Sequence, residues 1–407
     1  MVVKFMMVMT RTTRSTRLAS ACAGAACVVL TACSPSTATP SPADSASPSA
    51  VASPTATASP TTPPGPTATP QPVSTGVVPE GFAPNSVTFV SLETGWVLGG
   101  APCGSTSCVA LLRTSNAGHT WSAEQAPPTT FAPAPYSFYL SKGVSQVRFA
   151  DPQDGWAYGP ELWSTHDGGL HWNQIDLGSV WSLEASDGDV HAVILQQTTN
   201  TLVMESSPAN RDAWTTTGSL HSGAGPVPSA DLVLQGQSGW VVVNDRTVVD
   251  GDRLTAGRWA SWIPACTGTG GFAALSASSG SSLVALCQQG IWGGLQPPAV
   301  RAYFSNNGGQ TFYGGSAPLP GDVNQTGNAV ASPAPGVIVT DTYVNKQYEL
   351  IETFNHAGSW VPVATVSGQA TYLGFTSSSQ GVAITSNGKN VMLMTFDGGR
   401  HWAPVTF

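Results

Sequence analysis

From about residue 80 to the C-terminus, short apolar runs alternate with turns rich in Gly, Asn, Asp and Ser. One unit recurs in these runs, namely an apolar residue, a polar turn, and a Gly followed by an aromatic or Val. The apolar residue stands seven positions before the last residue of the unit in five pairs: Phe89 and Trp96, Phe149 and Trp156, Val233 and Trp240, Val330 and Val337, Phe375 and Val382. An apolar strand, a turn and a Gly-aromatic strand opening predict a β-hairpin.

A second repeat follows the first at a regular distance. Five eight-residue segments align without gaps as Ser/Thr, any, Asn/Asp, any, Gly (once Ala), any, Thr/His/Ser and an aromatic; they are 114–121, 165–172, 305–312, 353–360 and 395–402. Two degraded copies end at Trp214 and Trp259. The seven terminal aromatics are spaced by about 47 residues on average, the size of a four-stranded propeller blade. Two repeats in phase therefore predict seven blades.

The residue types of the second repeat suit a tight turn between the outer strands of a blade. Gly supplies positive φ without steric cost. The third-position side chain is expected to accept backbone N–H bonds across the turn, and the leading hydroxyl to add another. These third-position residues are Asn116, Asp167, Asn307, Asn355 and Asp397. We therefore expect Asp167 and Asp397 to be turn clamps rather than catalytic carboxylates.

These repeats resemble those of the BNR/Asp-box propellers, and the pairing of Gly-Trp with Thr-x-Asp-Gly-Gly-x-x-Trp is most similar to the photosystem II assembly/stability-factor-like group. The resemblance covers about residues 80–407. It implies an all-β, seven-bladed β-propeller with Asp-box turns on the outer rim, which we place at residues 79–407. It implies little about activity, because this fold carries enzymes, receptors and assembly factors alike. We expect no photosynthetic role.

The N-terminus predicts export. Residues 1–17 are basic, 18–32 are apolar or small, and Leu30-Thr31-Ala32-Cys33 closes the segment, which is the layout of a signal peptide. The last four residues resemble a bacterial lipobox, which implies a signal peptide at 1–32 and lipid attachment at Cys33. The alternative is an ordinary signal peptide with a chance Cys. The lipidated form predicts a location in the bacterial cell envelope, on the outer face of the cytoplasmic membrane.

The next segment, within 33–78, predicts a disordered linker before the propeller. Of residues 34–72, 35 are Pro, Ser, Thr or Ala, and such a segment lacks the apolar groups that offset ordering entropy. Fully extended, it would reach about 120 Å. Four of the 15 basic residues precede residue 18, so the rest of the chain carries 11 basic against 23 acidic residues. This acidity argues against nucleic acid and anionic lipid as partners of the folded part. We expect a monomer that contacts the membrane through its lipid anchor only.

Four further cysteines predict disulfides, as export to an oxidising compartment allows. Four cysteines permit three connectivities, and blade geometry favours the local pairs Cys103 with Cys108 and Cys266 with Cys287. No His lies at ligand spacing from either pair, so we predict no metal site and no cofactor. The Asp-Gly-Asp stretches at 187–189 and 250–252 lack the other oxygen ligands of a calcium loop and predict hairpin turns.

The candidate catalytic residues favour the interpretation that this protein is not an enzyme. The Arg-Ile-Pro motif of sialidases is missing, and the first strand region, 87–99, has no Arg. A different glycan-active hydrolase is the alternative, because two facing carboxylates would suffice. Its candidates are Glu161, Asp245 and Asp341, each expected alone in a loop on the face opposite the Asp-boxes, where a solvated role is the simpler interpretation.

The same face carries long connections with aromatic residues, which suit recognition. The predicted ligand-binding residues are Tyr136, Tyr139, Trp292, Tyr343 and Tyr348. The alternative is that these rings pack the seams between blades. The sequence thus predicts a non-catalytic binding or scaffold protein for a protein or glycan ligand.

Overall fold

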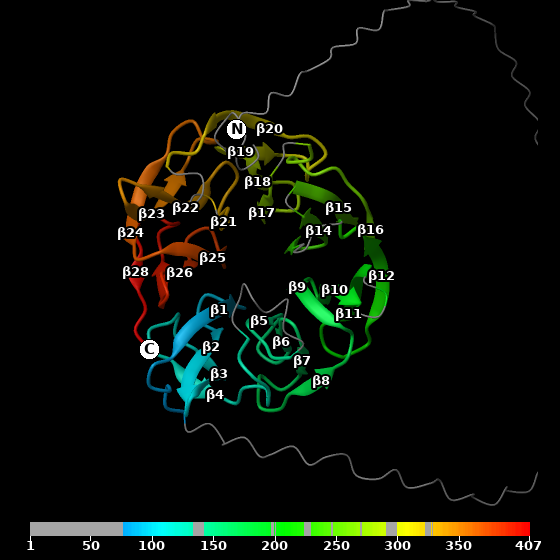
Figure 1. The fold of residues 1–407 in the computed structure, drawn as a ribbon, viewed down its shortest axis with the longest axis vertical. Helices are drawn as coiled ribbons and strands as arrows, with labels where there is room; N and C mark the ends of the chain where they lie inside the picture. The colour runs from blue at the N-terminus through cyan, green and yellow to red at the C-terminus, as the bar shows by residue number, and fades with distance from the viewer. Residues whose placement is uncertain are drawn as a thin grey trace, which may run out of the picture. The chain divides into compact units, whose positions relative to one another are not determined.

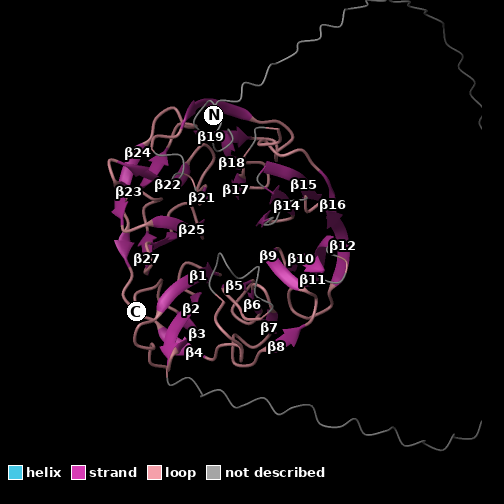
Figure 2. Ribbon diagram, viewed as in Figure 1, coloured by secondary structure: helices cyan, strands magenta, loops and turns pink. Residues whose placement is uncertain are grey.

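Seven four-stranded antiparallel sheets stand around a common centre in the computed structural model (Figure 1). The structure describes residues 76–132, 142–196, 199, 201–223, 229–245, 247–268, 271–289, 299–321, 327 and 329–407. Strands and loops make up all of these residues (Figure 2), and none of them belongs to a helix that could cross a membrane. The predicted seven-bladed, all-β propeller is confirmed. The predicted signal peptide, Cys33 and most of the linker lie outside the described residues.

Each blade is built from four strands that are consecutive in the chain. Blades 1 and 2 consist of β1 (Ala83–Phe89), β2 (Gly95–Cys103), β3 (Thr106–Thr114), β4 (Ser122–Glu124), and of β5 (Gln146–Phe149), β6 (Gly155–Tyr158), β7 (Leu162–Thr165), β8 (Asn173–Ile175). Blades 3 and 4 consist of β9 (Ser179–Ser186), β10 (Asp189–Gln196), β11 (Thr201–Pro208), β12 (Thr215–Leu220), and of β13 (Ser229–Gln235), β14 (Ser238–Asp245), β15 (Thr247–Thr255), β16 (Arg258–Ser261).

The last three blades repeat the arrangement. They consist of β17 (Ala273–Ala277), β18 (Leu283–Gln289), β19 (Ala299–Ser305), β20 (Tyr313–Pro318); of β21 (Val330–Ala331), β22 (Ile338–Val344), β23 (Gln347–Thr353), β24 (Val361–Val366); and of β25 (Gln369–Phe375), β26 (Gly381–Ser386), β27 (Asn390–Thr395), β28 (Ala403–Pro404).

The first strand of each blade lies nearest the centre and the fourth lies at the rim (Figure 1). Because neighbouring strands are antiparallel, the turn after the first strand and the turn after the third strand lie on the same face of the ring. All five eight-residue repeats fall in the turns after third strands, as their spacing predicts. We call this face the box face. The turns after second strands and the connections between blades lie on the opposite face.

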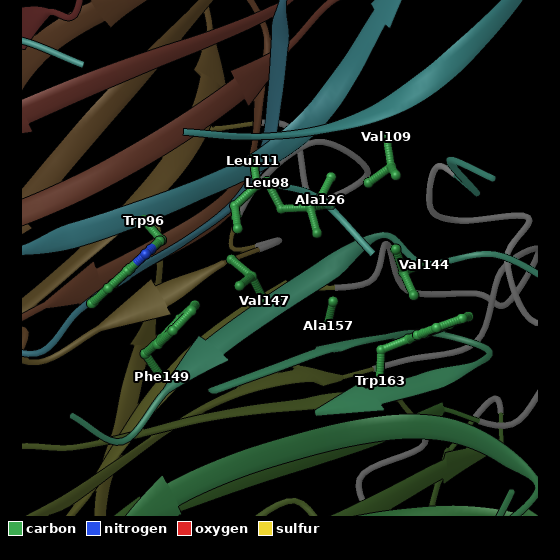
Figure 3. Packing of buried hydrophobic residues seen from close by; sticks show 10 residues of the cluster. All are labelled: Trp96, Leu98, Val109, Leu111, Ala126, Val144, Val147, Phe149, Ala157 and Trp163. Atoms are coloured by element: carbon green, nitrogen blue, oxygen red, sulfur yellow. The ribbon is translucent and has the colours of Figure 1, made fainter. Parts of the chain in front are cut away.

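The core of the molecule lies in the seams between blades. Figure 3 shows the seam between blades 1 and 2, where Trp96 and Leu98 of β2 pack against Val147 and Phe149 of β5. The Trp96 and Phe149 rings stack with centroids 3.8 Å apart. Trp96, like Trp156 and Trp240, is fully buried. Burial of one such ring removes about 150–250 Å² from water, so the repeated tryptophans hold neighbouring blades together.

In blades 1, 2 and 7 the Gly that opens the second strand makes room for an aromatic ring of the first strand. A Cβ atom at Gly155 would lie 2.5 Å from the Phe149 ring, and the pairs Phe89 with Gly95 and Phe375 with Gly381 show the same crowding. This contact explains why the sequence repeats an aromatic residue together with a Gly.

In blades 4 and 6 the hairpins form, but the register expected from the spacing is wrong. In blade 4 a two-residue turn makes Leu234, not Val233, the partner of Gly239. In blade 6 Val330 pairs with Thr340, and Gly336 lies in the turn at φ +77°. The shorter turn in blade 4 shifts the pairing by one residue although the distance along the sequence is unchanged. The stretch 250–252 is likewise no turn, because it lies inside β15.

Within residues 76–407, blade 7 receives no strand from the segment before β1. Ala123 N in blade 1 donates a hydrogen bond to Gly76 O, so this segment begins beside β4. Blades 7 and 1 are joined instead by side chains: Asn390 Nδ2 donates to Pro84 O at 2.7 Å, and the Phe82 and Phe407 rings lie 5.1 Å apart. Packing and side-chain hydrogen bonds therefore close the ring across 76–407.

Both predicted disulfides are confirmed. Cys103 and Cys108 bridge the tip of the β2–β3 hairpin with Cα atoms 5.7 Å apart. Cys266 and Cys287 join the connection before β17 to β18, with Cα atoms 5.2 Å apart.

Candidate functional site

Each of the five box turns is held by the same hydrogen bonds. In blade 2, Thr165 Oγ1 donates to Asp167 Oδ1 at 2.9 Å, and accepts from Gly169 N at 2.9 Å. The third-position oxygen also accepts the backbone N–H four residues later, at 2.9–3.0 Å in every case. The residues that accept this bond are Asn116, Asp167, Asn307, Asn355 and Asp397.

Hydrogen bonding also sets the charge of the two aspartates. Burial alone would raise the pKa of Asp397, but the bonds from His401 and Thr395 outweigh it and lower the pKa to about 2. The pKa of Asp167 is lowered in the same way by His171 and Thr165. A carboxylate held ionised within its own turn is poorly suited to donate a proton to a substrate.

The predicted ligand-binding aromatics are only partly within the described residues. Tyr136, Tyr139 and Trp292 lie outside them. Tyr343 and Tyr348 are cross-strand partners at the end of the β22–β23 hairpin, on the opposite face, with ring centroids 4.7 Å apart. Both rings are half-buried next to an exposed two-residue turn. They form a small aromatic platform on that face.

The three carboxylates considered for hydrolysis belong to three blades that are not neighbours, blades 2, 4 and 6, and none of them lines the central cavity described below. Glu161 accepts hydrogen bonds from Thr129 Oγ1 and from Trp163 Nε1, at 2.5 and 3.1 Å. Asp245 ends β14.

The expectation for Asp341 is wrong. This residue lies within β22 rather than in a loop, and it is fully buried rather than solvated. Its carboxylate accepts from the backbone N–H groups of Ala329 and Ala370, both at 3.4 Å. A buried carboxylate is acceptable there because it bonds to backbone of the adjoining strands, which a sequence pattern does not reveal.

The central channel holds a cluster of charged and polar side chains that the sequence did not predict. The first strands enclose a cavity of about 740 Å³, lined by Arg148 of β5, Glu184 of β9, Asp231 of β13 and Tyr372 of β25. Arg148 Nε and Glu184 Oε1 form an ion pair at 2.8 Å, and the two side chains are only 15% and 26% exposed. The guanidinium also lies 5.6 Å from the centre of the Tyr372 ring, a cation–π distance.

Burial controls the titration of these groups. Burial disfavours the charge on Arg148, but Glu184 keeps the pKa of Arg148 above its usual value. Burial raises the pKa of Glu184 more than Arg148 lowers it. Burial also raises the pKa of Asp231 to about 6, against the hydrogen bond from Leu275 N, and Glu184 adds to the rise.

A signal for this cluster was present in the sequence. Arg148 directly precedes Phe149, and the corresponding residues before Phe89 and Phe375 are Thr88 and Gly374. Only 9% of the residues in this chain are charged, so a charged residue next to an aromatic that packs between blades is unusual. Its position identifies the strand face that points to the channel. Among the described residues, no three His, Cys, Asp or Glu side chains gather as a metal-binding group.

Solved structures share the fold at low sequence identity. A structure described as YCF48 bound to D1 peptide is 16% identical, covers 78% of this chain and 93% of its own, and superposes with a TM-score of 0.51. The β-propeller domain of the Trilobed protease from Pyrococcus furiosus is 9% identical, with coverage of 80% and 98% and a TM-score of 0.53. A Mycobacterium tuberculosis puromycin-hydrolyzing peptidase is 14% identical, with coverage of 83% and 54% and a TM-score of 0.54.

These similarities show a β-propeller and leave the activity open, since the neighbours include peptidases as well as the peptide-bound YCF48. No protein-family model matches the sequence, and no curated protein matches it either.

Proposed function

We propose that this chain is a non-catalytic, lipid-anchored binding or scaffold protein of the BNR/Asp-box type. In this proposal Cys33 carries the lipid on the outer face of the bacterial cytoplasmic membrane, and the segment before residue 79 is a tether. The propeller presents its opposite face to a protein or glycan ligand and acts as a monomer. Cofactors and metals have no part in this role.

The observation that carries the proposal is that the polar residues repeated along the sequence are used within the box turns themselves. The Asn and Asp side chains of all five turns accept hydrogen bonds from their own turns. They build a rigid support and leave recognition to the loops of the other face, as is usual for loops on rigid scaffolds. A related fold is described as binding a peptide, which supports a protein ligand.

The Tyr343 and Tyr348 platform provides the sharpest test on the described part of the opposite face. We expect the full chain to capture a partner from bacterial envelope extract, and the double variant Tyr343→Ala/Tyr348→Ala to lose most of that capture. Phe354→Ala/Phe396→Ala is the matched control, since it removes two exposed rings from the box face. Adding Tyr136→Ala, Tyr139→Ala and Trp292→Ala tests the other predicted anchors. If the five-residue variant on the opposite face still captures the partner and the box-face control does not, the ligand surface does not lie on the opposite face, and the proposal is refuted.

A glycan-active hydrolase is the second candidate, and the channel favours it through one observation. Glu184 and Asp231 come from adjacent blades, and burial together with the Glu184 charge raises the pKa of Asp231 to about 6. A carboxyl with a pKa in this range suits a general acid. Release of reducing sugar from a polysaccharide panel, abolished by Asp231→Asn or Glu184→Gln, would establish this activity and displace the non-catalytic proposal.

A further inference from the structure

One blade lacks a box turn altogether, and a hollow lies in its place. In blade 2 the residues 166–172 separate β7 from β8. In blade 4 only Ala256 and Gly257 separate β15 from β16, both at positive φ (51° and 74°). Trp259 survives from the repeat on β16, but the turn before it has been reduced to its minimum.

In other blades the box turn packs against the preceding blade. Trp240 Nε1 of blade 4 donates to Gly308 O in the box of blade 5, at 3.0 Å. Trp172 in the box of blade 2 donates to Gln125 O next to blade 1, at 2.9 Å. A Cβ at Gly399 in the box of blade 7 would touch Val339 of blade 6 at 3.0 Å. A full box turn therefore fills the seam on the box face.

Between blades 3 and 4 this filling is missing, and a cavity of about 410 Å³ remains. We call it the blade 3–4 pocket. Blade 3 contributes Ser186, Asp189, His191 and Ser206 to its lining, and blade 4 contributes Leu234 and Leu254. Its size is in the usual range for small-molecule sites, about 300–1,000 Å³.

His191 presents an unused hydrogen-bond donor to this pocket. The residue is 9% exposed, and its Nδ1 accepts a hydrogen bond from Trp259 Nε1 at 3.2 Å. Because an indole N–H can only donate, Nδ1 carries no proton, and in the neutral ring the proton is on Nε2. Burial lowers the pKa of His191 more than Asp189 raises it, which favours that neutral ring. No described residue accepts a hydrogen bond from Nε2–H, and this atom is not one of the fully buried unpaired atoms, so it remains accessible to a ligand in the pocket that His191 lines.

We propose that the blade 3–4 pocket binds a sugar ring of a glycan. Sugar hydroxyls both donate and accept, which matches the His191 donor, the Asp189 carboxylate and the hydroxyls of Ser186 and Ser206. The Leu234 and Leu254 side chains offer an apolar surface to the C–H face of the ring. The site lies on the box face, so it is separate from the surface proposed above for partner binding.

A cation is the main chemical competitor, because the pocket also contains Asp187 and Asp189. The neutral His191 donor disfavours it, since an N–H group pointing into the site repels a positive charge. Among the described residues, no three side chains that could ligate a metal ion gather in this pocket.

The test is titration of the purified full chain with glucose, N-acetylglucosamine, cellobiose and chitobiose, followed by NMR at the Trp259 indole N–H. This proton bonds to His191 and reports on the pocket directly. We expect at least one of these sugars to shift the signal in a saturable way. His191→Asn keeps an acceptor near the indole but deletes the Nε2 donor, and it should weaken binding by about tenfold, as loss of one hydrogen bond does. Asp189→Asn, at an exposed strand end, should also weaken it. His221→Asn is the matched control on the opposite face and should change nothing.

Three results would overturn the proposal. They are the lack of a saturable shift with all four sugars, equal affinity in the His191→Asn and His221→Asn variants, and saturable shifts only with putrescine or calcium chloride. Because the readout is a sugar titration, its failure leaves partner capture through the opposite face untouched.

Discussion

Glu352, in the third strand of blade 6, gives the fold a strong expected pH dependence. Its carboxyl group is fully buried, and neither oxygen has a hydrogen-bond partner among the described residues. Both oxygens face Gly399 in the box turn of blade 7, where the nearby charges are Arg400 and Asp397. Burial raises the pKa of Glu352 to about 7, with Arg400 opposing the rise and Asp397 adding to it.

The sign and size of the effect follow from linkage. A carboxyl whose pKa is higher in the folded than in the unfolded state stabilises the fold at low pH. That contribution is lost as the pH rises from the unfolded value of 4.5 through the folded value of about 7. The shift corresponds to about 3 kcal/mol above pH ~8. Glu352→Gln keeps the shape of the protonated acid and removes the titration, so its free energy of unfolding should gain on the wild type as the pH rises.

The assay is urea unfolding of wild type and Glu352→Gln at about pH 5 and about pH 8.5, where the stability difference should change by about 2–3 kcal/mol in favour of the variant. Any fixed cost of the buried amide cancels in this comparison. Glu349→Gln, on the same strand but at a half-buried position, is the matched control. A difference between Glu352→Gln and wild type that is the same at both pH values would refute the reasoning.

Three further predictions follow from the packing and the ion pairs. Asp397→Ala removes the acceptor of the blade 7 turn and should cost about 1–2 kcal/mol in urea unfolding, whereas Asp397→Asn, the residue type of three other boxes, should cost less than half as much; equal losses would contradict the clamp role. Glu184→Gln leaves Arg148 without its charged partner inside the channel and should destabilise the fold by about 3 kcal/mol in urea unfolding. In a double-mutant cycle of Arg148→Met and Glu184→Met, the double variant should lose less stability than either single variant. Gly155→Ala should lower the melting temperature by several degrees, because the new Cβ would meet the Phe149 ring. Gly188 lies at a turn with open space around it, so Gly188→Ala should lower the melting temperature less. The reverse order of the two variants would contradict the packing account.

The repeats predicted the architecture because each repeat position has one physical role. Gly155 must be small beside Phe149, and Trp156 must be large to fill a seam, so both leave a periodic record in the sequence. The box turns could also be predicted from the sequence, because their hydrogen bonds join residues that are close together along the chain. Register was less predictable, because a shorter turn moved Leu234 into the place expected for Val233 without changing the sequence spacing.

The candidate sites were much harder to predict than the fold. Arg148, Glu184 and Asp231 come from blades 2, 3 and 4 and line one cavity only once these blades pack side by side, so no short spacing along the chain relates them. Asp341 resembled a loop carboxylate because its two backbone donors lie 12 and 29 residues away. The blade 3–4 pocket arises from residues that are missing at the blade 4 turn, and the sequence shows only a degraded repeat there.

Site-specific photo-crosslinking tests most directly whether the opposite face is the binding surface. A photoreactive amino acid would replace Asn345, at the exposed tip of the β22–β23 hairpin, or Arg400, exposed on the box face, in the full chain within a bacterial envelope. The account predicts a discrete crosslinked partner from position 345 and none from position 400. A discrete partner from position 400 alone would contradict it.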